Sequence, residues 1–297
     1  MKMEKLALEK EEYLLIKDFK DIEKYRYSLN HLVKKTYGFD FEVWYQKGYW
    51  TDKYRPYSIL CKDEIIANVS VNPIDFLADG KMKKTLQIGT VMTDEAFRCR
   101  GLSRLLIETV LKEYEASCDL IYLYANDTVL EFYPKFGFKK EEEYIYTGIF
   151  NQGRDKLSIR KLNMNDGKDI ALITRLVKNT IPVSRYQMTG NPELVFFYLT
   201  SMMSDNIYYF KEIDLAAVVE TGVEDIHLLD IYSEKSFDLN EVIRSLVYQD
   251  GMKVSLGFTP LNQSLFYCER LKEEGLTFFT KKDCFIDKGR FPALSHA

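Results

Sequence analysis

The sequence is poor in the residues that hold metals or build disulfide frameworks. Its 297 residues include only three histidines and five cysteines. The cysteines are odd in number, widely spaced and without a CxxC pair. This pattern argues against a disulfide scaffold and against a zinc site, and it indicates a reducing compartment. We therefore predict a protein that uses no metal.

Long apolar runs and an excess of one charge are also missing. No apolar run approaches the ~20 residues of a membrane span, and the chain opens with a charged segment rather than a secretory signal. The net charge of −4 is shared equally by residues 1–150 and 151–297, so neither half offers the basic surface that nucleic acids require. We predict a cytoplasmic protein that has neither a membrane nor a nucleic acid as its partner.

The composition is that of a soluble globular protein with a large core. Hydrophobic residues make up 46% of the chain, aromatic residues 14% and charged residues 29%. The length fits two domains of about 150 residues each. We predict domains at 1–150 and 151–297, and a homo-oligomer is compatible with this composition.

Residues 87–106 predict a strand, a short turn that contains Gly101, and an amphipathic helix. Gly101 lets the backbone approach a ligand, and the amides at the start of the helix favour an anion. The segment is interpreted as a phosphate cradle, and a plain strand-to-helix connection is the alternative. Apolar residues recur after the turn with helical spacing, at Leu102, Leu105, Leu106, Val110 and Tyr114. Cationic donors come from Arg98, Arg100 and Arg104.

Two ordered motifs resemble those of the GNAT N-acetyltransferase superfamily. Val91-x-Thr93 followed by residues 98–103 and a helix resembles the acetyl-CoA pyrophosphate loop, Gln/Arg-x-x-Gly-x-Gly/Ala. Ser103 departs from this pattern, but its hydroxyl fits a helix start and can donate to a phosphate. Residues 126–138, Asn-x-x-Val-x-x-Phe-Tyr-x-x-x-Gly-Phe, resemble the late motif. The predicted order of elements in 1–150, β-α-α-β-β-β-α-β-α-β, is also that of GNAT enzymes.

The resemblance implies acetyl-CoA as a cosubstrate. The backbone of Val91 and Thr93 would hold its pantetheine arm, and Asn126 would contact the arm or, alternatively, cap a helix. Tyr133 falls where the family places a tyrosine that protonates the departing thiolate, a role that suits a phenol with a pKa of about 10. A buried core aromatic is the alternative for Tyr133. The pyrophosphate would be bound by Arg98, Cys99, Arg100, Gly101, Leu102, Ser103 and Arg104.

The second half repeats the first at low fidelity. A strand at 157–160, a helix at 170–179 and strands at 207–210, 215–220, 227–232 and 254–258 follow the same order. Residues 233–239, however, contain no glycine and place Glu234 and Asp238 where a pyrophosphate would bind. The predicted fold class is therefore α/β with an α+β mixed sheet, built as tandem GNAT-like domains of which the second has no coenzyme A loop. A plain α+β partner domain is the alternative.

Candidate acceptor residues come from an aromatic cluster, and the base that deprotonates the acceptor is not identified by spacing. Trp44 and Tyr45 lie where GNAT enzymes receive the acceptor, and aromatic faces attract amines; core packing is the alternative. Acetyltransferases of the enhanced-intracellular-survival type, which the two halves resemble, bring a terminal carboxylate to the active site. That resemblance makes the carboxylate of Ala297, or the imidazole of His296, a candidate base; a tail packed for stability is the alternative.

The predicted function is transfer of an acetyl group from acetyl-CoA to a primary amine by direct attack. The acceptor would be a small molecule or a peptide, and polyamines, aminoglycosides, amino acids and peptide amines all fit the sequence. The alternative function is an acyl-CoA-binding sensor or scaffold with little turnover.

Overall fold

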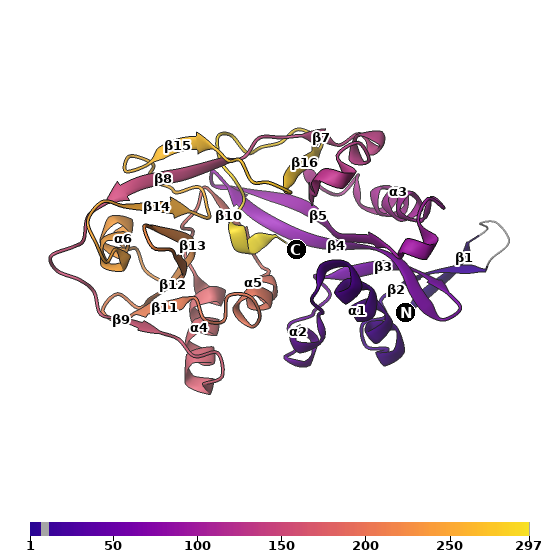
Figure 1. The fold of residues 1–297 in the computed structure, drawn as a ribbon, viewed down its shortest axis with the longest axis horizontal. Helices are drawn as coiled ribbons and strands as arrows, with labels where there is room; N and C mark the ends of the chain where they lie inside the picture. The colour runs from indigo at the N-terminus through magenta and orange to yellow at the C-terminus, as the bar shows by residue number, and fades with distance from the viewer. Residues whose placement is uncertain (7–11, 297) are drawn as a thin grey trace.

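The computed structural model describes residues 1–6 and 12–296, and these residues form two sheets (Figure 1). In the first sheet, the described residues run in the order β1 (Lys2–Leu6), β2 (Tyr13–Lys17), β3 (Arg55–Cys61), β4 (Glu64–Ala78), β5 (Lys81–Thr93), β6 (Leu120–Ala125), β16 (Thr277–Lys281) and β7 (Lys139–Lys140), and β10 (Tyr186–Thr189) pairs with β4. In the second sheet, the order is β15 (Tyr267–Arg270), β8 (Tyr144–Phe150), β14 (Met252–Leu256), β13 (Asp225–Ser233), β12 (Leu215–Thr221), β11 (Ile207–Phe210) and β9 (Ile159–Lys161).

Two amphipathic helices cover opposite faces of the first sheet. Helix α1 (Glu23–Tyr37) packs Leu29, Leu32 and Val33 into one core, and α3 (Leu102–Tyr114) packs its apolar side into another. Strand residues alternate between the two cores, as a sheet buried on both sides requires. Gly38, at φ +84°, ends α1 and donates its N–H to the Lys34 carbonyl. The short helix α2 (Glu42–Gln46) follows.

The second sheet repeats the order of the first. In the first unit β3, β4 and β5 are antiparallel, and α3 then leads to the parallel strand β6. In the second unit β11, β12 and β13 are antiparallel, and α6 (Leu239–Leu246) leads to the parallel strand β14. The helices α4 (Gly167–Asn179) and α5 (Pro192–Leu199) complete the second unit. The predicted tandem α/β arrangement is confirmed.

Strands cross the predicted division at residue 150. Strand β8 ends at that residue but pairs with β14 and β15 in the second sheet. Strand β16 comes from the end of the chain and lies between β6 and β7 of the first sheet, with Phe279 opposite Leu123. Strand β10 extends the pairing of β4. Each sheet is therefore completed by a strand from the other half of the sequence.

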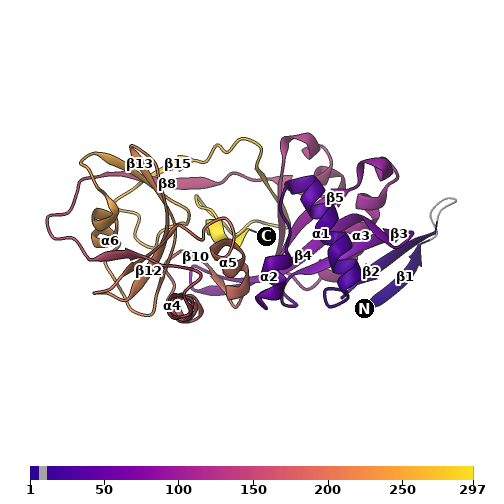
Figure 2. The same cartoon turned by 60° about the horizontal axis from the view of Figure 1, so that its bottom comes forward.

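The segment before residue 297 is buried between the two sheets. Phe291 is fully buried, stacks on Phe76 and packs at a tilt against Tyr122, with ring centroids 4.1 and 4.7 Å apart. The 3₁₀ turn η4 (Ala293–Ser295) follows, and Leu294 packs into the core of the second unit. This yellow segment lies between the sheets in both views (Figures 1 and 2). It brings residue 296 to the place where the two units meet.

Candidate active site

The site begins where the two parallel strands of the first sheet separate. Strand β5 pairs with β6 from Thr85 opposite Leu120 to Ile88 opposite Leu123. Beyond these pairs β5 continues to Thr93 and β6 to Ala125 without pairing to each other. The unpaired ends leave a wedge between the strands whose backbone groups are available to a ligand.

A β-bulge sits at the start of this wedge. Gly89 lies opposite Ser70, and the next pair joins Met92 to Asn68, so two residues of β5 face one of β4. Thr90, at the bulge, has a φ of +47°, which is unusual for a β-branched residue.

Polar side chains hold the bulge in place. The Asn68 amide donates to the Thr90 carbonyl at 2.9 Å, and the Tyr54 hydroxyl lies 3.0 Å from the Thr90 hydroxyl. Ser70 donates to the Tyr54 hydroxyl at 2.8 Å and accepts from Asn68 at 2.9 Å. Because these groups are buried and bonded to one another, they fix a strained backbone beside the wedge.

The two residues expected to hold a pantetheine arm lie on β5 in the wedge. The Val91 carbonyl accepts from the Tyr37 hydroxyl at 3.0 Å, and the Thr93 carbonyl accepts from Arg98 Nε at 3.4 Å. A ligand that used these carbonyls would share or replace both contacts. Tyr37 is the last residue of α1, and the sequence analysis did not select it; its place just before the helix-ending Gly38 was the only available signal.

The predicted phosphate loop forms an uncapped helix start. Cys99 and Gly101 have φ values of +63° and +76°, and Gly101 is the N-cap of α3 without a side-chain bond. The first helical hydrogen bond runs from the Leu105 amide to the Gly101 carbonyl at 3.0 Å. The amides of the three residues between them therefore have no acceptor inside the helix. A Cβ built on Gly101 meets nothing within 4 Å, so the cradle is open to an anion.

The cationic side chains of the loop lie at its rim. Arg98 is exposed and lies 3.6 Å from Glu95, and Arg104 lies 3.7 Å from Glu108. Arg100 donates to the Tyr13 hydroxyl at 2.9 Å and to the Ala96 carbonyl at 3.2 Å. The two exposed pairs are weak in water, so both arginines can turn towards a phosphate.

The remaining loop residues differ in what they can offer a ligand. The Ser103 hydroxyl lies 2.7 Å from the Thr93 hydroxyl, which links the helix start to the end of β5. Leu102 is buried in the core, so only its backbone can contact a ligand, and Cys99 is an exposed free thiol.

The matching helix of the second unit is capped by the chain itself. Asp238 is the N-cap of α6, and its carboxylate accepts from the Asn240 amide at 2.9 Å. Glu234, nearby in the sequence, is paired with Arg175 at 2.9 Å. An acidic cap where α3 has a bare glycine repels a second anion.

Tyr133 lies in the 3₁₀ turn η3 (Tyr133–Phe136), with 4% of its surface exposed. Its ring packs against Phe138 and against Phe279 of β16, so the end of the chain helps to place it. Burial raises the pKa of Tyr133, and the Tyr37 phenol adds to the effect. Burial also raises the pKa of Tyr37 to about 12. Both phenols therefore keep their protons at neutral pH.

Asn126 follows β6 and caps the 3₁₀ turn η2 (Asp127–Val129). Its side-chain oxygen accepts from the Thr128 amide at 3.1 Å and from the Thr128 hydroxyl at 2.6 Å. The capping alternative is thus present in the structure, and the exposed amide group remains available to a ligand.

A cavity of about 290 Å³ opens beside the bulge and between the two units. Elements from both halves of the sequence contribute to it, including α5 and the segment before residue 297. Among the residues that the structure describes, no acidic or basic side chain other than the histidine lines this cavity. Its walls are Tyr37, Phe39, Phe41, Trp44, Tyr54, Gln87, Ile88, Gly89, Thr90, Tyr124, Leu194, Phe197, Tyr198, Met202, Leu276 and His296.

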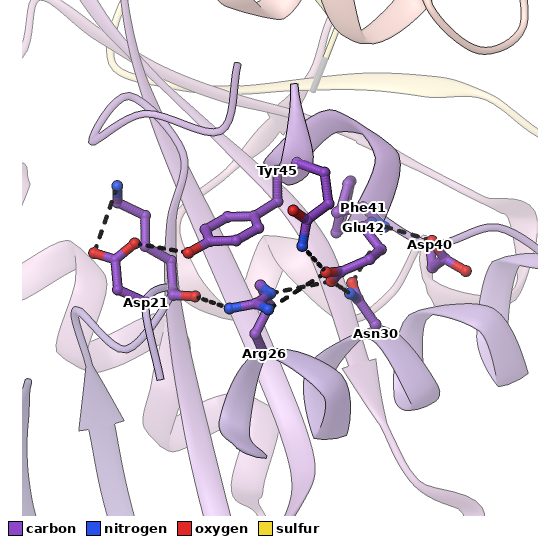
Figure 3. Close-up of polar contacts among 9 residues, drawn as sticks. Asp21, Arg26, Asn30, Asp40, Phe41, Glu42 and Tyr45 are labelled. Carbon is purple, nitrogen blue, oxygen red and sulfur yellow. Dashed lines mark hydrogen bonds and ion pairs between the residues drawn. The ribbon is translucent and has the colours of Figure 1, made fainter. Parts of the chain in front are cut away.

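The structure separates the two predicted acceptor residues. Trp44 lines the cavity, is buried, and donates its indole N–H to the Glu193 carbonyl at 2.9 Å. Tyr45 turns away from the cavity: its ring lies 3.9 Å from the Arg26 guanidinium, and its hydroxyl donates to Asp21 at 3.1 Å (Figure 3). Neighbouring residues on a helix face different directions, which explains the difference.

A buried polar cluster fixes the segment that carries Trp44. Arg26 Nε donates to Glu42 at 3.0 Å, and Asn30 donates to the same carboxylate while accepting from the Phe41 amide (Figure 3). Burial alone would raise the pKa of Glu42, but hydrogen bonds from Arg26, Gln46 and Asn30 lower it below its usual value. This ionised carboxylate joins α1 to α2 at the edge of the cavity.

The segment before residue 297 reaches the cavity, as the tail hypothesis required. The His296 ring stacks on Tyr124 with centroids 4.0 Å apart, and its carbonyl accepts from the Tyr198 hydroxyl at 2.6 Å. Its Nε2 atom is buried and has no partner. Burial and the charge of Arg290 lower the pKa of His296 to about 3, so the imidazole is neutral at physiological pH. Ala297 lies outside the described residues, and its role as a base stays a prediction.

Two searches of the described part of the chain were negative. No group of three histidine, cysteine, aspartate or glutamate residues in it could hold a metal ion. No described helix combines the length and the apolar character needed to cross a bilayer.

Comparisons with known proteins agree with the geometry. Residues 26–138 match the family model of the acetyltransferase (GNAT) family. No curated protein matches the sequence. A conserved protein of unknown function from Enterococcus faecalis, named a probable N-acyltransferase, is 13% identical and has a TM-score of 0.57; the similarity covers 95% of this chain and 73% of that one.

Two further solved structures share the fold. A GCN5-related N-acetyltransferase from Kribbella flavida is 14% identical, with a TM-score of 0.55 and coverage of 91% of this chain and 71% of that one. Eis1 from Mycobacterium abscessus is 12% identical, with a TM-score of 0.50 and coverage of 75% and 63%. The loop, the wedge and the family match together show that residues 26–138 belong to the GNAT acetyltransferase superfamily.

Proposed function

We propose that this protein is an N-acetyltransferase that moves the acetyl group of acetyl-CoA directly to a primary amine. The observation that carries the proposal is the uncapped start of α3 beside the wedge between β5 and β6. The uncapped helix start suits the pyrophosphate of coenzyme A, and the wedge suits the pantetheine arm and the thioester. Cavity and wedge meet at the bulge, where an amine could reach the thioester carbonyl.

Each donor-side residue has a physical role in this proposal. The α3 amides, with Arg98 and Arg104, would bind the pyrophosphate, and Asn126 would contact the arm. A backbone N–H at the bulge would stabilise the oxyanion, because a fixed donor needs no reorganisation as charge develops. Tyr133 would protonate the departing thiolate, and its raised pKa keeps that proton available.

The cavity supports an apolar acceptor. Its walls are mainly aromatic, and no carboxylate among the described residues lines it. Aminoglycosides and polyamines carry several charges, each of which is costly to bury without a partner. A small aromatic or aliphatic primary amine suits the cavity better, because aromatic faces accept an ammonium group and apolar walls accept its substituent. Tyr45 would contribute only by holding Arg26 and α2.

The second unit would not bind coenzyme A. Asp238 caps α6 with a carboxylate, so we assign one coenzyme A site, in residues 1–150, and an acceptor cavity to which both halves contribute. The five cysteines of the sequence are all free, which fits the proposed cytoplasmic location.

Calorimetric titration with acetyl-CoA tests the donor site. The wild type should bind, and Gly101→Glu should abolish binding because it places a carboxylate against the pyrophosphate. Gly80→Glu is a matched control, since Gly80 has a φ of +78° and equally open space but lies in the β4–β5 turn. A wild type that does not bind acetyl-CoA contradicts the proposal.

Release of free thiol separates an enzyme from an acyl-CoA sensor. The assay uses benzylamine, 2-phenylethylamine, tryptamine, spermidine and an aminoglycoside as acceptors. Tyr133→Phe should lower kcat by about 10²-fold or more, the usual contribution of a proton donor. Tyr146→Phe, which removes another buried hydroxyl that donates to the Lys288 carbonyl, should not. Binding without turnover on any amine would favour the sensor.

A further inference from the structure

The cavity of about 290 Å³ beside the bulge, in which we place the amine, is called the acceptor cavity below. Acyl transfer to an amine there releases a proton that must leave this cavity. The described walls of this cavity contain no carboxylate. His296 lies there, but a pKa of about 3 prevents it from holding a proton at neutral pH. Among the described residues, a proton acceptor for this cavity therefore has to lie behind the side chains that line it.

Tyr124 leads out of this first layer. It lies on β6 just past the last residue that pairs with β5, and it lines the acceptor cavity. Its hydroxyl donates to Glu143 Oε1 at 3.2 Å. The ring stacks on His296 at 4.0 Å and on Phe278 of β16 at 5.2 Å, so it is held on both sides.

Glu143 stands between Tyr124 and a second cavity. It lies in the connection from β7 to β8, with 8% of its surface exposed. It lines a cavity of about 310 Å³ on the other side of Tyr124. Leu276 lines both cavities, so they are neighbours. Polar residues such as Glu142, Lys140 and Arg270 line the second cavity, which we call the outer cavity.

We propose that Tyr124 and Glu143 form a proton relay that carries the acceptor's proton from the acceptor cavity to the outer cavity. The inference rests on the proposed function, because it concerns the same reaction. It assigns the proton transfer, for which residue spacing in the sequence identified no base, to two residues outside both GNAT-like motifs.

The acceptor ammonium passes one proton to the Tyr124 oxygen, directly or through one water, while the Tyr124 hydroxyl proton moves to the Glu143 carboxylate. The free amine attacks the thioester carbonyl, the carbon–nitrogen bond forms, and the carbon–sulfur bond breaks. The thiolate takes a proton from Tyr133, whose oxygen takes the second proton of the former ammonium. Glu143 then releases its proton to water in the outer cavity.

The charges around Glu143 suit a group that exchanges protons near neutral pH. Burial raises the pKa of Glu143 to about 7, while the charge of Arg290 and the Tyr124 hydrogen bond oppose the rise and Glu273 adds to it. The other titratable groups that interact with Glu143 are Tyr122 on β6 and Cys284. Burial raises the pKa of both, so they are neutral at pH 7.

The test is the pH dependence of kcat, measured by thiol release with the fastest amine of the panel. The wild type should lose activity below about pH 7, as Glu143 becomes protonated. Glu143→Gln should lose this inflection, and its kcat at pH 8 should fall about tenfold or more with little change in the KM of the amine. Tyr124→Phe keeps the stacked ring and should give the same two effects.

Matched controls remove equivalent groups outside the relay. Glu142→Gln changes the neighbouring glutamate, and Tyr144→Phe removes the hydroxyl that donates to Glu142 at 3.1 Å. Both should keep the wild-type profile. The relay is overturned if either relay variant keeps the inflection near pH 7, even with a lower kcat, because a structural defect lowers activity without moving a titration. A wild type that binds acetyl-CoA but turns over no amine overturns the proposed function instead.

Discussion

The buried carboxyl of Glu143 makes a prediction about stability that needs no substrate. Its pKa rises from 4.5 to about 7 on folding, because burial disfavours the ionised form. Between these values the folded protein binds more protons than the unfolded chain. The free energy of unfolding therefore falls as the pH rises through this window, and the loss is complete above about pH 7.

The size of the effect follows from the two pKa values. One pKa unit corresponds to about 1.4 kcal/mol, and integration from pH 5 to pH 8 gives a loss of about 2–3 kcal/mol from this group. Glu143→Gln is neutral at every pH and avoids the loss. Relative to the wild type, the variant should gain about 2–3 kcal/mol between pH 5 and pH 8. Keeping the Glu143 carboxylate buried as the proton acceptor therefore lowers the stability of the folded protein above about pH 7.

Urea unfolding at pH 5 and pH 8 measures this difference. Trp44 and Trp50 are both buried beside α1, so their fluorescence reports on the first unit. The Glu143→Gln midpoint should move above that of the wild type at pH 8 by about 1 M, with a much smaller difference at pH 5. Glu142→Gln should show no such pH dependence. An equal difference between variant and wild type at both pH values would refute the reasoning.

Three further predictions concern the assembly of the molecule. Residues 1–150 expressed alone should aggregate or unfold, because β16 is missing from the edge of β6; a soluble, cooperatively melting fragment in circular dichroism would contradict this. Asp238→Ala should lower the free energy of unfolding by about 1 kcal/mol, because α6 loses its helix cap. Combined with Gly101→Glu, which removes the proposed site of the first unit, Asp238→Ala should not create acetyl-CoA binding in the second unit. Glu42→Gln should be less stable than the wild type at pH 7. That difference should shrink as the pH falls through the lowered pKa of Glu42, which thermal melting at several pH values would measure.

Local patterns in the sequence located the elements that carry the donor site. Helix α3 begins at Leu102, as the apolar spacing after Gly101 indicated. The acidic segment of the second half also fits its place, since Asp238 caps α6. These features depend on neighbours a few residues apart, so periodicity and turn residues encode them directly.

Other elements could not be read from the sequence because their partners are distant. Strand β1 is short and charged, β10 has only four residues, and β16 follows a turn-rich segment without a strand-like alternation. The sequence analysis also missed α5, whose Leu194, Phe197 and Tyr198 line the acceptor cavity. Tyr37 and Tyr124 stood among 21 tyrosines, and no spacing distinguishes one that faces a cavity from one in a core.

The sequence by itself determined that one helix start, and not its counterpart, is suited to an anion. Gly101 and the arginines around it specify that property locally, and Asp238 removes it from the second unit. The tertiary structure alone decided where the cavity proposed for the acceptor lies and which groups surround it. Strand β16 and the buried segment up to His296 bring residues from the end of the chain beside β6, and burial there gives Glu143 its raised pKa. Desolvation and long-range strand pairing are properties of the assembled core, which no short window of sequence contains.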